Sequence, residues 1–232
     1  MMRKAKKSKR TNAIKMVFYS VTIFALLITI AVPLLYALGY PISLNTANLV
    51  STVSLSFFLG TVAISWMLHK RIKPENLTGE LGLSRDRLTL KNIGYGILIF
   101  ISYLIITVAI SEITQLTHTS INSNAASVLG IFPLWLLPFT MILAPLNEEI
   151  LFRGFMVPRV GIVISALIFA ALHSGYASYL EFFMALWFGL VAGYAFKRTK
   201  SLYPSLVTHM LVNSTTVLAL VGSGMIAMVH IL

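Results

Sequence analysis

The chain has 232 residues, of which 57% are hydrophobic and only 11% are charged, and its mean hydropathy is +0.86. Because soluble proteins carry roughly 25% charged residues, this composition indicates a polytopic membrane protein with little length left for a soluble domain. The chain has no cysteine, which excludes disulfide bonds and thiolate metal sites. The formal net charge of +11 would suit a nucleic-acid binder, but the placement of the charges argues against one.

Long apolar segments predict a succession of helices that each approach the roughly 20 residues needed to cross a bilayer. We expect helices at about 15–38, 46–70, 90–112, 129–157, 160–175, 179–197, 201–219 and, as a short terminal piece, 221–231. The predicted fold class is an all-α, polytopic transmembrane helix bundle with seven to eight spans. Whether the last, short segment crosses the membrane is left open. We divide the chain into a basic cytoplasmic tail at 1–14 and a single transmembrane domain at 15–232, with a catalytic core at about 129–220.

Basic residues cluster beside the apolar segments rather than on one soluble surface. They are Arg3, Lys4, Lys6, Lys7, Lys9, Arg10 and Lys15 before the first span, Lys70, Arg71, Lys73, Arg85, Arg87 and Lys91 in one loop, and Lys197, Arg198 and Lys200 in another turn. With Arg159, all except Arg153 fall on one side of the predicted topology, as the positive-inside rule requires. This pattern predicts a cytoplasmic N-terminus, seven crossings, contact with anionic lipid and no nucleic-acid partner. The basic N-terminus resembles that of a signal peptide, but the apolar run after it is too long, so we expect a retained first span in the plasma membrane, with the endoplasmic reticulum membrane as the alternative.

Two local patterns predict packing. The loop at 70–91 is expected to run along the cytoplasmic surface with Leu83 and Leu88 dipping into the interface, and a merely solvated loop is the alternative. Gly189 and Gly193 form a small-xxx-small pair that permits close helix contact, which we expect within one chain rather than in a dimer. The oligomeric state is left open.

Three apolar segments carry polar residues that a bilayer disfavours. They are Glu148, Glu149 and Arg153 in NEEILFRG, His173 in FAALH, and His209 with Asn213 in HMLVN. Ionisable residues within membrane helices are rare, face the protein interior, and mark functional sites. Counted from the basic markers at about 1.5 Å per residue, Glu148 lies roughly 16 Å deep, His173 about 20 Å and His209 about 13 Å. Three separate helices therefore predict one site at a common depth.

Spacing within the helices indicates how these side chains are arranged. Glu149 and Arg153 are four residues apart with the acid first, which favours an ion pair. His209 and Asn213 share a helix face for the same reason, and Phe169 lies one turn before His173. Pro145 is expected to kink its helix and make room for water near the carboxylates. Taken singly, each motif also has a structural explanation: an ion pair, a hydrogen-bonded core histidine, or polar contacts between helices.

The three motifs together resemble a known family. EEILFR has the pattern EExxxR, FAALH has FxxxH and HMLVN has HxxxN, in that order on successive apolar helices. The chain is similar to the CPBP-family intramembrane proteases, which include the CAAX prenyl endopeptidases and the bacterial Abi proteins. The motifs span residues 148 to 213, and the layout of spans matches over most of the chain.

This resemblance implies an intramembrane endopeptidase that hydrolyses peptide bonds of membrane-associated or prenylated, CAAX-type, substrates. It implies that Glu148 and His173 activate a water, that His209 and Asn213 stabilise the oxyanion, and that Glu149, Arg153 and Phe169 support the site. The residue types suit these roles without the family, because a desolvated carboxylate is a competent base and imidazole and amide groups can donate to an oxyanion.

The role of a metal stays open between a glutamate-type enzyme and a metalloprotease. Glu148, His173 and His209 could form a zinc set of two histidines and a glutamate, but the HExxH helix of many zinc proteases is absent. We expect no required cofactor, with zinc as the alternative.

Two other functions compete with proteolysis. A membrane immunity or scaffold protein would bind a partner peptide through the same residues without cleaving it. A small transporter would use Glu148 and Glu149 to relay protons, but the internal symmetry common in transporters is not visible in this sequence. The expected partners are a membrane peptide or protein substrate and the lipid bilayer.

Overall fold

The computed structural model describes residues 2–118, 128–176 and 178–224, with the backbone alone for residues 2–9 and Tyr176. Helices and their connecting turns fill these ranges, and no strand occurs in them. The first part contains α1 (Met2–Ala37), α2 (Leu44–His69), η1 (Pro74–Asn76), α3 (Leu77–Glu80), η2 (Arg85–Arg87) and α4 (Leu90–Leu116). The second part contains η3 (Leu134–Leu136), η4 (Phe139–Leu143), α6 (Ala144–Glu149), η5 (Ile150–Met156), α7 (Val157–Val160), α8 (Ile162–Leu172), η6 (His173–Tyr176), α9 (Tyr179–Thr199) and α10 (Tyr203–Gly222).

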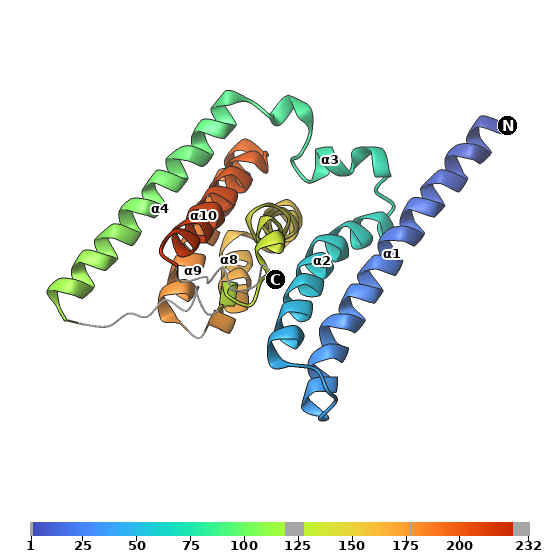
Figure 1. Ribbon diagram of the computed structural model, residues 1–232. Coiled ribbons are helices and arrows are strands. Elements are labelled where there is room, and N and C mark those ends of the chain that lie inside the picture. Colours follow the sequence, from blue (N-terminus) through green and yellow to red (C-terminus); the bar gives the residue numbers. More distant parts are fainter. Residues whose placement is uncertain (1, 119–127, 177, 225–232) are drawn as a thin grey trace.

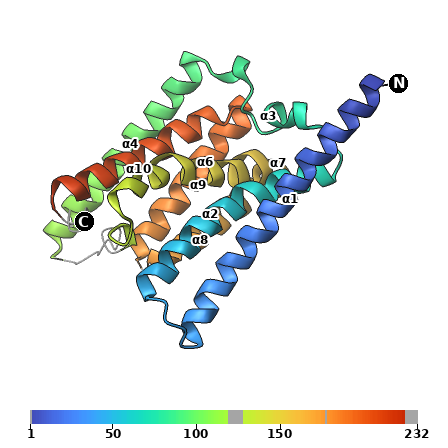
Figure 2. The same ribbon diagram turned by 45° about the vertical axis from the view of Figure 1, so that its right-hand side comes forward.

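The helices form a bundle with α1 and α4 at its two edges (Figure 1). α1 packs on α2 at one edge, while α4 lies at the other edge against α10. The segment from α6 to α7 runs through the middle between α2 and α10, with α8 and α9 packed on each other beside it (Figure 2). Two pairs of hydroxyl groups hold the first hairpin together, Thr22 with Ser65 at 2.8 Å and Thr29 with Ser54 at 2.9 Å.

By length and composition, six helical segments of the described chain can cross a membrane. They are Arg10–Ala37, Leu44–His69, Leu90–Leu116, Leu134–Val160, Tyr179–Thr199 and Tyr203–Gly222. The helix predicted at 160–175 is shorter than a span, since α8 has 11 residues, or about 16 Å of rise, before it tightens into η6. Six of the seven to eight predicted spans are therefore confirmed as helices long enough to cross a membrane. Residues 225–232, the greater part of the predicted terminal piece, lie outside the described ranges.

The loop predicted at 70–91 is docked on the protein, so it is not merely solvated. Leu77 and Leu81 are buried in an apolar cluster with residues of α2, η5 and α10, whereas Leu88 remains 53% exposed. The amide of Leu202 donates to the carbonyl of Gly82 at 2.9 Å, which fastens the loop to the turn between α9 and α10. Gly82 has φ +78°, and a Cβ there would lie 2.8 Å from the Lys200 carbonyl oxygen, so this close contact requires glycine.

The glycine pair of α9 packs within the chain, as predicted. A Cβ on Gly189 would lie 2.8 Å from that of Ala166 in α8, and a Cβ on Gly193 would lie 2.9 Å from Cγ2 of Ile162. The two helices thus approach each other closely because α9 lacks side chains at these positions.

Candidate active site

The acidic pair lies on a short α-helix between two π-helical segments. α6 carries Glu148 and Glu149 at its end, η4 precedes it and η5 follows it. A proline has no N–H, so the backbone carbonyl four residues before it loses its helical hydrogen bond. For Pro145 this is the carbonyl of residue 141, in η4, and for Pro158 it is the carbonyl of residue 154, in η5. The sequence predicted a kink at Pro145 within a single helix at 129–157. The single helix is wrong, because this stretch is divided into η4, α6, η5 and α7. π-Helical turns are rare and are often found at functional sites.

Glu149 is the centre of a buried polar network. Its side chain is fully buried, and its Oε1 accepts hydrogen bonds from Arg153 Nη1 at 2.7 Å and from His209 Nδ1 at 2.9 Å. A carboxylate beside an arginine can only accept, so the proton of this imidazole lies on Nδ1 and its Nε2 faces the other way. The four-residue spacing of Glu149 and Arg153 thus forms the ion pair that it predicts, and it also fixes the His209 ring.

Arg153 is held between two aromatic rings. Its guanidinium carbon lies 4.3 Å from the ring centre of Phe169 and 4.6 Å from that of Phe188, and the residue is 1% exposed. Stacking of this kind stabilises a desolvated guanidinium. Phe188 also contacts the His209 ring edge-on at 5.1 Å. The sequence analysis missed Phe188, because an aromatic residue in an apolar helix carries no distinguishing signal.

Glu148 differs from its neighbour in being partly exposed, although its Oε2 atom is buried. Its side chain is 20% exposed and its Oε2 lies 3.8 Å from His209 Nε2, beyond hydrogen-bonding distance. This oxygen has no hydrogen-bond partner in the described part of the chain. One carboxylate is thus locked in a network, and the other presents a free oxygen to the same imidazole.

His173 ends α8 and faces this group. Its Nδ1 lies 2.9 Å from the carbonyl oxygen of Phe169, and its ring is 4.5 Å from that of Phe169. Since a carbonyl only accepts, Nδ1 carries the proton and Nε2 keeps its lone pair. The ring lies near enough to Glu148, His209 and Arg153 to interact with them electrostatically.

Asn213 is the predicted site residue that is least involved in the network. Its Nδ2 donates to the carbonyl of Thr140 in η4 at 2.8 Å, which anchors the amide and leaves its second N–H unused by that bond. The anchor of this side chain therefore lies on η4 rather than on the acidic pair of α6. Thr140 and Asn147 are polar site neighbours that sequence analysis missed, although both are polar residues in an apolar segment and the rule applied to Glu148 would have found them.

The residues of the alternative zinc set lie near one another but are not grouped as the ligands of one metal ion. Among the described residues, no three histidine or carboxylate side chains are grouped closely enough to hold a metal ion. His209 in particular directs Nδ1 to Glu149 and has its Nε2 3.8 Å from Glu148. The arrangement does not fit a metal, and we derive no step through one.

Comparison with known proteins shows what the site-bearing part of the chain is similar to. Residues 130–215 match the family described as type II CAAX prenyl endopeptidase, Rce1-like, a family of proteases. All seven predicted site residues fall within that range. This segment is therefore similar to that family, in agreement with the resemblance of its motifs, and the apolar helices make the chain a multi-pass membrane protein.

A curated relative was found in Lactococcus lactis subsp. lactis (strain IL1403), the UPF0177 protein YxdF, which is 25% identical over 115 residues. The alignment covers 47% of this chain and 64% of the relative, so the chain spans just under two thirds of that protein. No solved structure matches the chain.

Proposed function

We propose that this protein is an intramembrane endopeptidase that hydrolyses peptide bonds of membrane-associated or prenylated substrates. The observation that supports it most strongly is the pair of carboxylates in different states. Each carboxylate keeps one buried oxygen without a hydrogen-bond partner, but Glu149 is bonded to Arg153 and His209 through its other oxygen, whereas the unpartnered Oε2 of Glu148 lies 3.8 Å from His209 Nε2. Separate environments for two adjacent acids are typical of sites where one acts in catalysis and the other supports it.

Glu148 and His173 activate the nucleophile in this proposal. A water at the free oxygen of Glu148 gives up a proton to the carboxylate as its oxygen attacks the substrate carbonyl carbon. The lone pair on His173 Nε2 provides a second acceptor for the same proton. The proton then passes to the leaving amide nitrogen as the C–N bond breaks, so the products are a carboxylic acid, which keeps the second proton of the water, and an amine.

His209 and Asn213 stabilise the tetrahedral oxyanion. With Nδ1 donating to Glu149, Nε2 of His209 donates to the oxyanion when the ring is an imidazolium with a proton on each nitrogen, and Asn213 has one amide N–H beyond the bond to Thr140. Glu149 and Arg153 orient the imidazole, and Phe169 packs against both His173 and His209.

We further propose a glutamate-type reaction without a metal. This rests on the roles of Glu148 and His173 as proton acceptors and on the lack of a converging ligand set among the described residues. Cleavage should continue in the presence of a strong chelator, and its loss on chelation with recovery on adding zinc would favour the metalloprotease.

The test is cleavage of a library of membrane peptides, prenylated and unprenylated, by the purified chain in lipid, with new termini located by mass spectrometry. Glu148→Gln keeps the size of the side chain and removes its basicity, so it should lower the rate of cleavage about 10²–10⁴-fold. Glu112→Gln changes an exposed carboxylate of α4 in the same way and should cleave like the wild type. Binding of peptides without cleavage by any sample would favour the immunity or scaffold function instead.

A further inference from the structure

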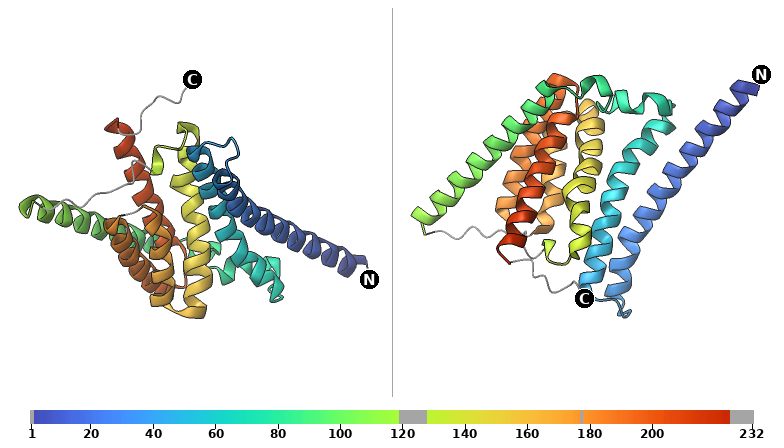
Figure 3. Two further views of the ribbon diagram at one scale, coloured as in Figure 1. Left: turned by 90° about the horizontal axis from the view of Figure 1, so that it is seen from below. Right: turned by 45° about the horizontal axis from the view of Figure 1, so that its top comes forward.

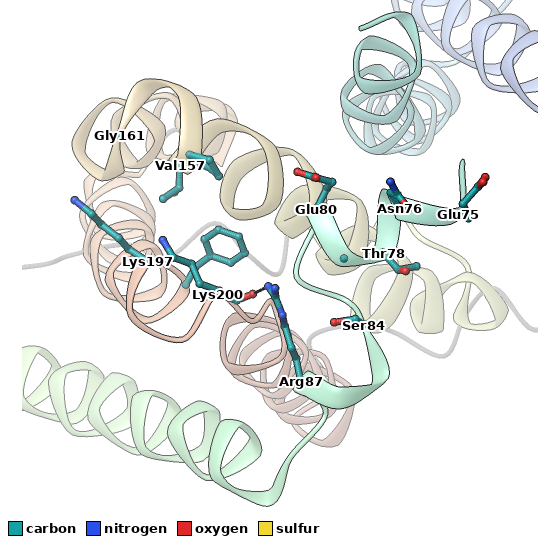
Figure 4. Close-up of a pocket in the computed structure, with 13 residues that line it drawn as sticks. Glu75, Asn76, Thr78, Glu80, Ser84, Arg87, Val157, Gly161, Lys197 and Lys200 are labelled. Atoms are coloured by element: carbon teal, nitrogen blue, oxygen red, sulfur yellow. Dashed lines mark hydrogen bonds between the residues drawn. The ribbon is translucent and has the colours of Figure 1, made fainter. Parts of the chain in front are cut away.

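A cavity of about 920 Å³ lies at the end of the bundle where the basic turns gather, away from the candidate active site. Its walls come from the docked loop around α3 and η2 on one side and from α7 and the end of α9 on the other (Figure 4). None of the seven predicted site residues lines it. A ligand bound in this cavity would therefore be distinct from the peptide bond that is cleaved.

Three cationic side chains line this cavity, two from the α9 wall and one from the η2 wall. Lys197 and Lys200 come from the end of α9 and Arg87 from η2 (Figure 4). Neither lysine has a carboxylate within ion-pair distance in the described part of the chain. The guanidinium of Arg87 donates to the Lys200 carbonyl, which fixes both residues at the rim.

The backbone that presents these cations is ordered by contacts on both sides. Lys200 has φ 55°, in the left-handed region, and ends α9 with its amide bonded to the Phe196 carbonyl at 2.8 Å. The next residues are tied to the docked loop by the Tyr203 hydroxyl, which donates to the Leu83 carbonyl at 3.0 Å, and by the bond from Leu202 to Gly82. The cationic wall is thus part of the folded bundle rather than a free tail.

The remaining lining suits an amphiphile. Val157, Pro158 and Phe196 supply apolar surface inside the cavity, and just beyond Gly161 the outer face of α8 exposes Val163 and Ile164. Glu75 and Glu80 lie on the side away from the lysines (Figure 4), and Glu80 interacts electrostatically with Arg159. Positive charge therefore predominates on the α9 side of the cavity, at the end of the spans where lipid headgroups lie.

We propose that this cavity binds a phosphate group, with Lys197, Lys200 and Arg87 as its ligands, and that the group belongs to the headgroup of an anionic phospholipid. A cavity of this size is within the range of roughly 300–1,000 Å³ typical of small-molecule sites and exceeds what an inorganic anion needs. Lysine and arginine side chains at the membrane surface attract anionic headgroups, and arginine adds directional hydrogen bonds. Binding at this site is independent of the proposed peptidase reaction.

The experiment measures lipid retention by native mass spectrometry and thermal unfolding of the purified full chain in a phosphate-free detergent. Phosphatidylglycerol, diacylglycerol and inorganic phosphate are titrated separately. The test variant is Lys197→Gln/Lys200→Gln. The matched control is Lys73→Gln/Arg85→Gln, which removes the same charge from exposed residues of the same end that do not line the cavity. Lys197→Arg/Lys200→Arg checks that the charge matters rather than the substitution.

Phosphatidylglycerol should bind the wild type, the control and the arginine variant alike, and the glutamine variant roughly tenfold or more weakly. Diacylglycerol should not bind in this way, since it lacks the phosphate. If inorganic phosphate raises the unfolding temperature as much as the lipid does, the phosphate site stands and its ligand is the soluble anion. Equal lipid binding by all variants, or an equal loss in the control, overturns the proposal.

Discussion

Arg153 is a charged side chain with 1% exposure, and two aromatic rings and one carboxylate stabilise it. The four-residue spacing to Glu149 predicted the ion pair, because it depends only on helix geometry. The common depth of Glu148 and His209 was likewise predictable from the basic markers at the helix ends. The two rings were not, because their place depends on how α8 and α9 pack, which no local pattern in the sequence encodes.

Removing Arg153 should destabilise the fold strongly. Arg153→Ala leaves the Glu149 carboxylate buried and without its cation, which typically costs about 3–5 kcal/mol. The double variant Glu149→Gln/Arg153→Met removes both charges and should lose much less. Thermal unfolding in detergent compares the two, and an Arg153→Ala protein as stable as the wild type would show that the pair contributes little.

Asn213 should affect the rate more than the stability. Asn213→Ala removes one oxyanion donor, for which the usual cost is about 10²–10³ in kcat, with little change in KM. The variant also loses the bond to the Thr140 carbonyl, so its unfolding temperature is measured in parallel. A fall in stability with an unchanged kcat would make Asn213 a packing residue.

At the scale of elements, the helix that carries the acids is broken where sequence analysis predicted one continuous helix. Prolines at 145 and 158 mark the places, but a proline can produce a kink, a 3₁₀ turn or a π turn, and packing decides among these. The apolar run at 160–175 resembles a membrane span in sequence, because hydropathy does not show where a helix ends. Its early end in a tight turn at His173 becomes visible only in the structure.

The contact between α2 and α6 should position Glu148. A Cβ on Gly60 would overlap Oδ1 of Asn147, the residue just before Glu148, and Asn147 Nδ2 also donates to Ser56 Oγ at 3.2 Å. Gly60→Ala should therefore lower kcat and cost about 1–3 kcal/mol of stability from overpacking.

Two further variants make that prediction specific. Gly94→Ala adds the same methyl group to α4 where nothing lies within 4 Å, so activity should be unchanged. Adding Asn147→Ala to Gly60→Ala relieves the clash and should restore part of the rate. No recovery in the double variant would mean that Gly60 acts through another contact.

At the scale of the whole molecule, the bundle places α1 with α2 at one edge and α4 at the other, around the segment that carries the site (Figure 3). Hydropathy predicted an all-helical membrane bundle, since every long apolar segment must satisfy its backbone internally. Hydropathy predicted more spans than the six described helices that are long enough to cross a membrane, because the length of an apolar run does not show where its helix ends.

The predicted orientation can be tested cleanly because the chain has no cysteine. We expect the basic end in the cytoplasm, so Lys73→Cys should react with a membrane-impermeant thiol reagent only after cells are permeabilised. Asn45→Cys, at an exposed position in the first turn of α2 and so at the opposite end of that helix, should react in intact cells. The reverse pattern would invert the topology.

Glu148 is the base of the proposed peptidase, and a single rate constant measures its contribution. For any peptide that the wild type cleaves, kcat is compared with that of Glu148→Gln in the same lipid at equal amounts of folded protein. We predict a fall of about 10²–10⁴, the usual contribution of general-base catalysis, with an unchanged unfolding temperature. An undiminished kcat in a folded Glu148→Gln protein would contradict the account.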